Sequence, residues 1–89
     1  MMKLIVAIVH HTDGEDVLHA LTAAGFRVTR IASNGGFLRR GSATLLVGAE
    51  ADKVQSAVQI IREYSVPPVD PGLKRAAVFV LKVDHYEQI

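Results

Sequence analysis

Residues 26–50 read FRVTRIASNGGFLRRGSATLLVGAE, which predicts two β-strands joined by a glycine-rich, basic loop. Apolar and polar side chains alternate over residues 26–29, the period of a half-buried strand, and residues 44–47 form a second run of β-branched and leucine side chains. The rest of the chain has the pattern of a scaffold for this stretch. We therefore look here first for a functional site.

The loop between the two strands, SNGGFLRRGS, combines features that suit a ligand carrying both a phosphate and a base. Asn-Gly-Gly at residues 34–36 can adopt positive φ, so backbone N–H groups can turn towards an anion. Phe37 stands where no core period requires an aromatic, and Arg39 and Arg40 follow it. The same composition is typical of an ordinary hairpin loop, in which Asn-Gly makes the turn and the arginines are solvated. Residue types alone leave both interpretations open.

Length and composition limit the class of protein. The 89 residues predict one domain, residues 1–89, with a small core, because a chain of this size buries only about 60 to 65% of its unfolded surface. A hydrophobic fraction of 49% and a charged fraction of 21% are typical of a compact globular domain. The net charge of +1 is too small for a protein that binds a long nucleic acid. Without cysteine, disulfides and thiolate metal sites are excluded.

The first apolar run, residues 4–9, is too short to span a membrane or to form the core of a secretory signal peptide. We therefore expect a cytoplasmic protein with no membrane partner. The same run is rich in isoleucine and valine, which favours a central strand covered on both faces.

The chain predicts six elements in the order β-α-β-β-α-β. They are a strand at residues 4–9, a helix between residues 12 and 25, the two strands of residues 26–50, a helix between residue 52 and about residue 64, and a strand at residues 76–83. Thr12 with Glu15, and Asp52 with Gln55, fit the capping-box pattern at the start of each helix. Gly25 predicts the end of the first helix, and the prolines of residues 66–74 predict a loop.

This order predicts a ferredoxin-like α+β fold, an antiparallel four-stranded sheet with two helices on one face. Both faces of the first strand are apolar, since Ile5, Ala7 and Val9 alternate with a second apolar set at residues 4, 6 and 8. The helices can cover only one of these faces. The other needs a partner, and the simplest partner is another copy of the chain. The sequence does not determine which set faces the partner.

Fold alone leaves function open, because this topology hosts many unrelated activities. An RNA-recognition module would carry stacking aromatics on its first and third strands, where this chain has LIVAIV and TLLV. A phosphatase of this topology would need a glycine-rich, arginine-containing loop after the first strand, where HHTDGED stands instead. We expect no catalytic residues, because no nucleophile and base stand at a recognisable spacing.

Metal binding is the remaining chemical option. His10 and His11 are adjacent, and adjacent residues of a strand point to opposite faces, so the pair is poorly placed to chelate one ion. Asp13 or His85 would have to complete such a site, and His19 lies off the apolar stripe of its helix. We therefore expect no metal centre.

Three runs of the chain, MKLIVAIV, LTAAGFRVTRIASNGGFLRRGSATLLVGAE and VFVLKVDHYEQI, resemble the PII-like cyclic di-AMP receptor family. These are small bacterial signalling proteins related to the nitrogen-regulatory PII proteins. The motif ASNGGFLRRG and the closing aromatic-x-Gln-x carry most of the resemblance. It implies a non-enzymatic signal-transduction protein, a homotrimer of ferredoxin-like subunits that pack through their open sheet faces. One cyclic di-AMP would lie in each cleft between neighbouring subunits, with no other cofactor.

The resemblance also implies a set of ligand-binding positions. They are Arg27, Val28, Thr29, Gly36, Phe37, Leu38, Gly48 and Gln88, with Ser42 where the family usually has asparagine.

Physical roles follow from the chemistry of these side chains. Arg27 would pair with a phosphate, and Thr29 and Gln88 would hydrogen-bond a purine edge. Phe37 would pack against a base, and the glycines would let the backbone approach the ligand.

The chain departs from the family in two places. Ser42 and Ala43 replace the usual Asn-Thr, and the segment of residues 65–74 is much shorter than in better-known members. These departures leave a looser site, a site for another adenine nucleotide, or an unused site as alternatives. Two hypotheses therefore remain: a sensor of cyclic di-AMP or a related adenine nucleotide with an unknown downstream protein, and a protein-interaction trimer without a small-molecule ligand.

Overall fold

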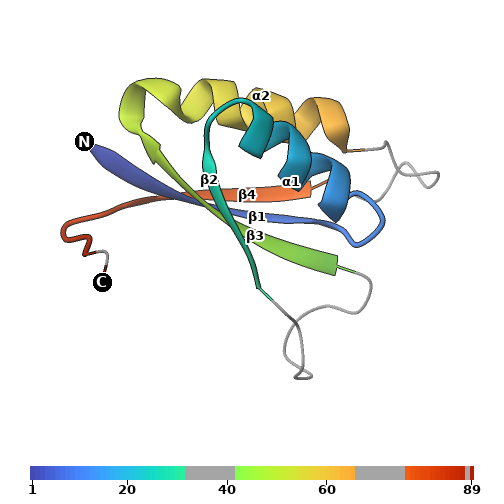
Figure 1. The fold of residues 1–89 in the computed structure, drawn as a ribbon, viewed down its shortest axis with the longest axis horizontal. Coiled ribbons are helices and arrows are strands. Elements are labelled where there is room, and N and C mark those ends of the chain that lie inside the picture. The colour runs from blue at the N-terminus through green and yellow to red at the C-terminus, as the bar shows by residue number, and fades with distance from the viewer. Residues whose placement is uncertain (32–41, 66–75, 88) are drawn as a thin grey trace.

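Four antiparallel strands form one sheet, and two helices cover one face of it (Figure 1). The structure is a computed structural model that describes residues 1–31, 42–65, 76–87 and 89. The elements are β1 (Met2–His10), α1 (Gly14–Ala23), β2 (Arg27–Ile31), β3 (Ser42–Glu50), the short 3-10 helix η1 (Ala51–Lys53), α2 (Val54–Tyr64) and β4 (Ala76–Lys82). Within the described residues, no helix is long and apolar enough to cross a membrane.

The strand order across the sheet is β2-β3-β1-β4, and every neighbouring pair is antiparallel. The predicted ferredoxin-like α+β fold is therefore confirmed. β1 lies between β3 and β4, as its continuous apolar run predicts. β2 and β4 form the two edges of the sheet.

The core lies between the sheet and the helices. Its fully or almost fully buried members are Ile5, Ala7, Val9, Val17, Leu21, Ala43, Leu45, Val47, Ala49, Ala57 and Ile61. Side chains alternate between the faces of a strand, so this core assigns residues 5, 7 and 9 of β1 to the helix side. Leu4, Val6 and Ile8 are half-buried on the open face. The structure thus answers a question that the sequence left undecided.

The turn after α1 sets where β2 begins. Gly25 adopts a positive φ of 94°, its N–H bonds to the Thr22 carbonyl at 3.0 Å, and the Phe26 N–H bonds to the Leu21 carbonyl at 3.0 Å. This double pattern is a Schellman motif, in which glycine avoids the Cβ clash of the left-handed region. The predicted stop at Gly25 is confirmed, and Arg27 becomes the first residue of β2.

The two predicted capping boxes are wrong. α1 begins only at Gly14, and neither Asp13 before it nor Lys53 before α2 makes a side-chain cap hydrogen bond. The Thr12 hydroxyl instead lies 2.8 Å from Nδ1 of His10, so it bonds within the turn rather than to the helix. At α2 the η1 turn leads directly into the helix, and the capping position itself is already helical.

Candidate functional site

The open face of the sheet is mostly apolar on β3, β1 and β4, and it carries Arg27 and Thr29 at the β2 edge. Residues paired across an antiparallel sheet share a face. The three rows of this face are Arg27, Gly48, Leu4 and Leu81; Thr29, Leu46, Val6 and Phe79; and Ile31, Thr44, Ile8 and Ala77. Two of its apolar members are about half exposed, Phe79 at 54% and Leu81 at 49%.

Gly48 creates a gap in the first of these rows. It pairs with Arg27 on one side and with Leu4 on the other. A Cβ built at Gly48 would have no other atom within 4 Å, and its φ is not positive. The backbone conformation at Gly48 therefore does not require glycine. The missing side chain leaves open space beside the Arg27 side chain.

Arg27 is exposed, and its side chain forms a hydrogen bond with an uncharged hydroxyl group. Its Nη1 donates a hydrogen bond of 3.3 Å to the hydroxyl oxygen of Tyr86, which lies beyond β4. Among the described residues, no carboxylate lies within ion-pair distance of Arg27. Its positive charge is therefore oriented but not neutralised within this part of the chain.

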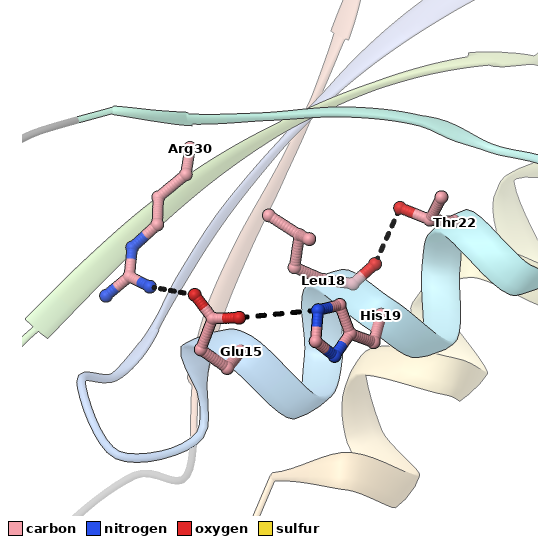
Figure 2. A network of polar contacts seen from close by, with 5 residues as sticks. All are labelled: Glu15, Leu18, His19, Thr22 and Arg30. Carbon is pink, nitrogen blue, oxygen red and sulfur yellow. Dashed lines mark hydrogen bonds and ion pairs between the residues drawn. The ribbon is translucent and has the colours of Figure 1, made fainter.

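Arg30, on the same strand, lies in a different electrostatic environment. It shares the helix-side face with Leu45, and its Nη1 lies 3.1 Å from Oε1 of Glu15. The other oxygen of Glu15 lies 3.4 Å from Nε2 of His19 (Figure 2). Arg30 is thus paired with a carboxylate, whereas Arg27 faces the open side of the sheet with no carboxylate of the described residues beside it.

The predicted site residues on β2 divide between the two faces. Thr29 stands on the open face next to Arg27 in the alternating pattern, whereas the Val28 side chain is half-buried and packs against the core. Any contact of Val28 with a ligand would have to use its backbone. Such a contact is sterically reasonable, because β2 pairs with β3 on one side only and is an edge of the sheet.

Ser42 lies far from Gly48 in the same subunit. It begins β3 and pairs with His10, whereas Gly48 lies six positions further along the strand. At about 3.3 Å per residue, the two positions are about 20 Å apart. The structure therefore separates Ser42 from the Arg27 and Gly48 end of the sheet.

Four predicted site residues, Gly36, Phe37, Leu38 and Gln88, lie outside the described residues. The first three belong to the segment that connects Ile31 of β2 to Ser42 of β3. This connection is at the Ser42 end of the strand pair, opposite to Arg27 and Gly48.

The replacement at position 43 does not belong to the open face. Ala43 is 5% exposed and is part of the core on the helix side. Its Cβ lies 3.2 Å from the point where a side chain on Gly14 would begin. Of the Ser42–Ala43 pair, only Ser42 has the face parity of Gly48.

The two adjacent histidines lie side by side, so the expectation that they face opposite ways is wrong. Their ring centroids are 4.9 Å apart with the ring planes at 30°. The reason is that β1 ends at His10, and His11 belongs to the turn, where strand alternation no longer applies. Within residues 1–31, 42–65, 76–87 and 89, no group of three or more metal-ligating side chains comes together.

Sequence reasoning missed the contact between Arg27 and Tyr86. The two residues are 59 positions apart along the chain, so no local pattern connects them. The available signal was the aromatic residue of the mostly polar closing segment, DHYEQI, which does not indicate a partner.

Two comparisons relate the chain to known proteins. The model of the family described as "Cyclic-di-AMP receptor" matches residues 2–67. The crystal structure of a functionally unknown protein from Pediococcus pentosaceus ATCC 25745 is similar over 99% of this chain and 97% of that chain, with 29% sequence identity and a TM-score of 0.79. The family match includes β1, α1, β2, β3 and α2, and the structural likeness extends over β4.

Proposed function

Because the chain belongs to the cyclic-di-AMP receptor family, we propose that it is a non-enzymatic sensor that binds cyclic di-AMP in clefts between the subunits of a homotrimer. Its output would be a change in the ordering of its loops that a downstream protein detects. A related adenine nucleotide is the next candidate ligand, because Ser42 replaces an amide side chain.

The observation that carries this proposal is the environment of Arg27. A guanidinium group binds phosphate oxygens through parallel N–H donors. Arg27 faces the open side of the sheet beside the space at Gly48. It donates a hydrogen bond to the Tyr86 hydroxyl, and no carboxylate of the described residues neutralises it. This arrangement suits a phosphodiester better than it suits a structural ion pair.

A cleft between subunits is supported by the separation of the implied contacts. Ser42 and Gly48 lie about 20 Å apart on one strand, which is too far for both to contact the same adenine. In a closed ring of subunits, one end of β3 can approach the opposite end of a neighbour's sheet. The apolar open face, with Val6 and the half-exposed Phe79, is the surface that such packing would cover.

In this arrangement Arg27 would bind phosphate, Thr29 and Gln88 would hydrogen-bond the base edge, and Phe37 would pack on the base. The Ser42 side chain is shorter than that of asparagine, so its hydroxyl would reach less far towards the adenine. The remaining implied contacts are Val28, Gly36, Leu38 and Gly48.

The alternative is a protein-interaction trimer without a small-molecule ligand. It is favoured by Ser42, because a hydroxyl can replace only part of the hydrogen bonding of an amide. It predicts that the loop of residues 32–41 docks on a partner protein directly.

A thermal-shift panel separates the two functions. We would measure the melting temperature with cyclic di-AMP, cyclic di-GMP, ATP, ADP and AMP. A ligand that binds only the native state stabilises it by about 2.7 kcal/mol at a concentration of one hundred times Kd, so cyclic di-AMP should raise the melting temperature by several degrees. If none of the five nucleotides raises it and calorimetry detects no binding, the interaction trimer is the better account.

A further inference from the structure

We infer that Tyr86 is a second anion-binding residue of the ligand site, which positions the Arg27 guanidinium and donates its own hydroxyl hydrogen to the same phosphate group. This inference rests on the proposed function, since it concerns the phosphodiester of that ligand. It adds to the site a residue that is not among the ligand-binding positions that the family resemblance implies.

The hydrogen-bond chemistry of the pair supports this role. A phenol hydroxyl can accept one hydrogen bond and still donate its own hydrogen. Tyr86 accepts from Nη1 of Arg27 at 3.3 Å, so its donor remains available for another group. Within the described part of the chain, Tyr86 makes no second hydrogen bond, and 56% of it is exposed.

A neutral partner orients a cation without cancelling its charge. Glu15 lies 3.1 Å from Arg30 and offsets part of its positive charge, so Arg30 attracts an anion less strongly than an unpaired arginine does. The Tyr86 hydroxyl limits the rotamers of Arg27 but leaves its full positive charge. Preorganising a long side chain in this way reduces the conformational entropy that is lost on binding.

The segment after β4 keeps its own carboxylates away from this pair. Asp84 lies 3.9 Å from the Lys82 ammonium, and Glu87 lies 3.8 Å from the His85 ring. Asp84 therefore lies near the last residue of β4 and Glu87 near a histidine of its own segment, and neither carboxylate is within ion-pair distance of Arg27.

The backbone of the same segment explains why Tyr86 reaches β2. The row of Arg27, Gly48, Leu4 and Leu81 lies near the end of the sheet where β4 finishes. The Val83 N–H bonds to the Met2 carbonyl at 3.3 Å, and the chain then continues past the start of β1 (Figure 1). A ligand bound to Arg27 and Tyr86 together would therefore link this segment to the opposite edge of the sheet.

The test is a double-mutant cycle on binding of cyclic di-AMP, measured by titration calorimetry on the full chain. The variants are Tyr86→Phe, Arg27→Gln and the double variant. Tyr86→Phe keeps the ring and removes only the hydroxyl. We expect it to weaken binding by about tenfold, the effect of one hydrogen bond to a charged group. The loss of affinity in the double variant should be smaller than the product of the two single fold-losses, because the two side chains act on one phosphate.

The matched control is Tyr64→Phe. Tyr64 is the only other tyrosine of the chain, and it is 47% exposed at the end of α2. This control should leave the affinity at the wild-type value. A melting curve without ligand gives the second readout, and Tyr86→Phe should melt within about one degree of the wild type because the hydrogen bond is exposed.

The outcomes distinguish this inference from the proposed function. If Arg27→Gln weakens binding and Tyr86→Phe does not, the role of Tyr86 is refuted while the receptor function stands. If the two single effects multiply in the double variant, Tyr86 and Arg27 do not act on one phosphate, and the inference is refuted. If Tyr86→Phe lowers the ligand-free melting temperature by several degrees, Tyr86 is a structural tether, which also refutes it. If the wild type binds no cyclic di-AMP, the proposed function fails first.

Discussion

At the scale of single residues, a substitution of Gly48 should change the affinity for the ligand without lowering the stability of the subunit. Its backbone has no positive φ and its Cβ position is empty, so alanine can be introduced without a clash in the subunit. Glycine in a strand costs stability relative to alanine. We predict that Gly48→Ala leaves the free energy of unfolding unchanged or raises it by up to about 1 kcal/mol, while the affinity for cyclic di-AMP falls. Urea denaturation and calorimetry measure the two quantities.

Gly25→Ala is the matched control for this prediction. A Cβ at Gly25 also has nothing within 4 Å, but the residue has a φ of 94°, a conformation that L side chains rarely adopt. Alanine there should cost about 1 to 2 kcal/mol of unfolding free energy and leave the affinity of the folded protein unchanged. Wild-type affinity in Gly48→Ala would mean that the ligand does not approach the sheet at Gly48.

At the scale of elements, the end of α2 depends on one buried hydroxyl. Ser65 is 3% exposed, and its Oγ donates a hydrogen bond of 2.6 Å to the Ile61 carbonyl. Removal of this donor leaves a buried acceptor with one partner fewer, at a cost of about 1 kcal/mol. We therefore predict that Ser65→Ala lowers the free energy of unfolding by about that amount, as measured by urea denaturation.

The first helix contains the same bond in an exposed setting. The Thr22 hydroxyl donates to the Leu18 carbonyl at 2.8 Å, also four positions back (Figure 2). Water can replace this bond, and alanine has the higher helix propensity, so Thr22→Ala should be neutral or slightly stabilising. Equal effects of the two substitutions would show that burial of Ser65 does not matter.

The loop of residues 32–41 provides a second prediction at this scale, for Phe37. If Phe37 packs on a base, Phe37→Ala should remove about 1 to 3 kcal/mol of binding free energy, or about ten- to hundredfold in Kd. A Phe37 packed in the core would instead cost about 3 to 5 kcal/mol of folding free energy. Calorimetry and denaturation on the same variant show which of the two is lost, and a loss in folding alone would contradict the ligand site.

At the scale of the whole molecule, the two faces of β1 should respond differently to charge. Ile5 is fully buried on the helix side, whereas Val6 is half-buried on the open face between Leu46 and Phe79. We predict that Ile5→Asp prevents folding, because an isolated charge in the core is very costly. Val6→Asp should keep the subunit folded and dissociate the trimer.

Sedimentation with circular dichroism distinguishes these results. The wild type should sediment as a trimer at micromolar concentration, and Val6→Asp as a smaller folded species. A wild-type monomer would contradict the trimer proposal, and an unfolded Val6→Asp variant would indicate that the open face is needed for folding of the subunit itself.

Local sequence patterns determined the element order and therefore the fold. The apolar run at residues 4–9 predicted a central strand, the alternation over residues 26–29 predicted a half-buried strand, and Gly25 predicted the end of α1. These patterns can be interpreted because side-chain periodicity and positive φ depend only on residues close in sequence. The capping boxes failed for two local reasons. The Thr12 hydroxyl bonds to His10 in the turn before α1, and the η1 turn leads directly into α2.

Only the tertiary structure decided how the predicted site residues are distributed. The register of β2, β3 and β1 placed Arg27 beside the gap at Gly48 and put Ser42 at the other end of β3. The packing of the core placed Ile5 against the helices and left Val6 on the open face. The hydrogen bond between Arg27 and Tyr86 joins residues that are 59 positions apart in the sequence. Pairing between strands and contacts between distant segments depend on the packing of the complete chain, which no local period encodes.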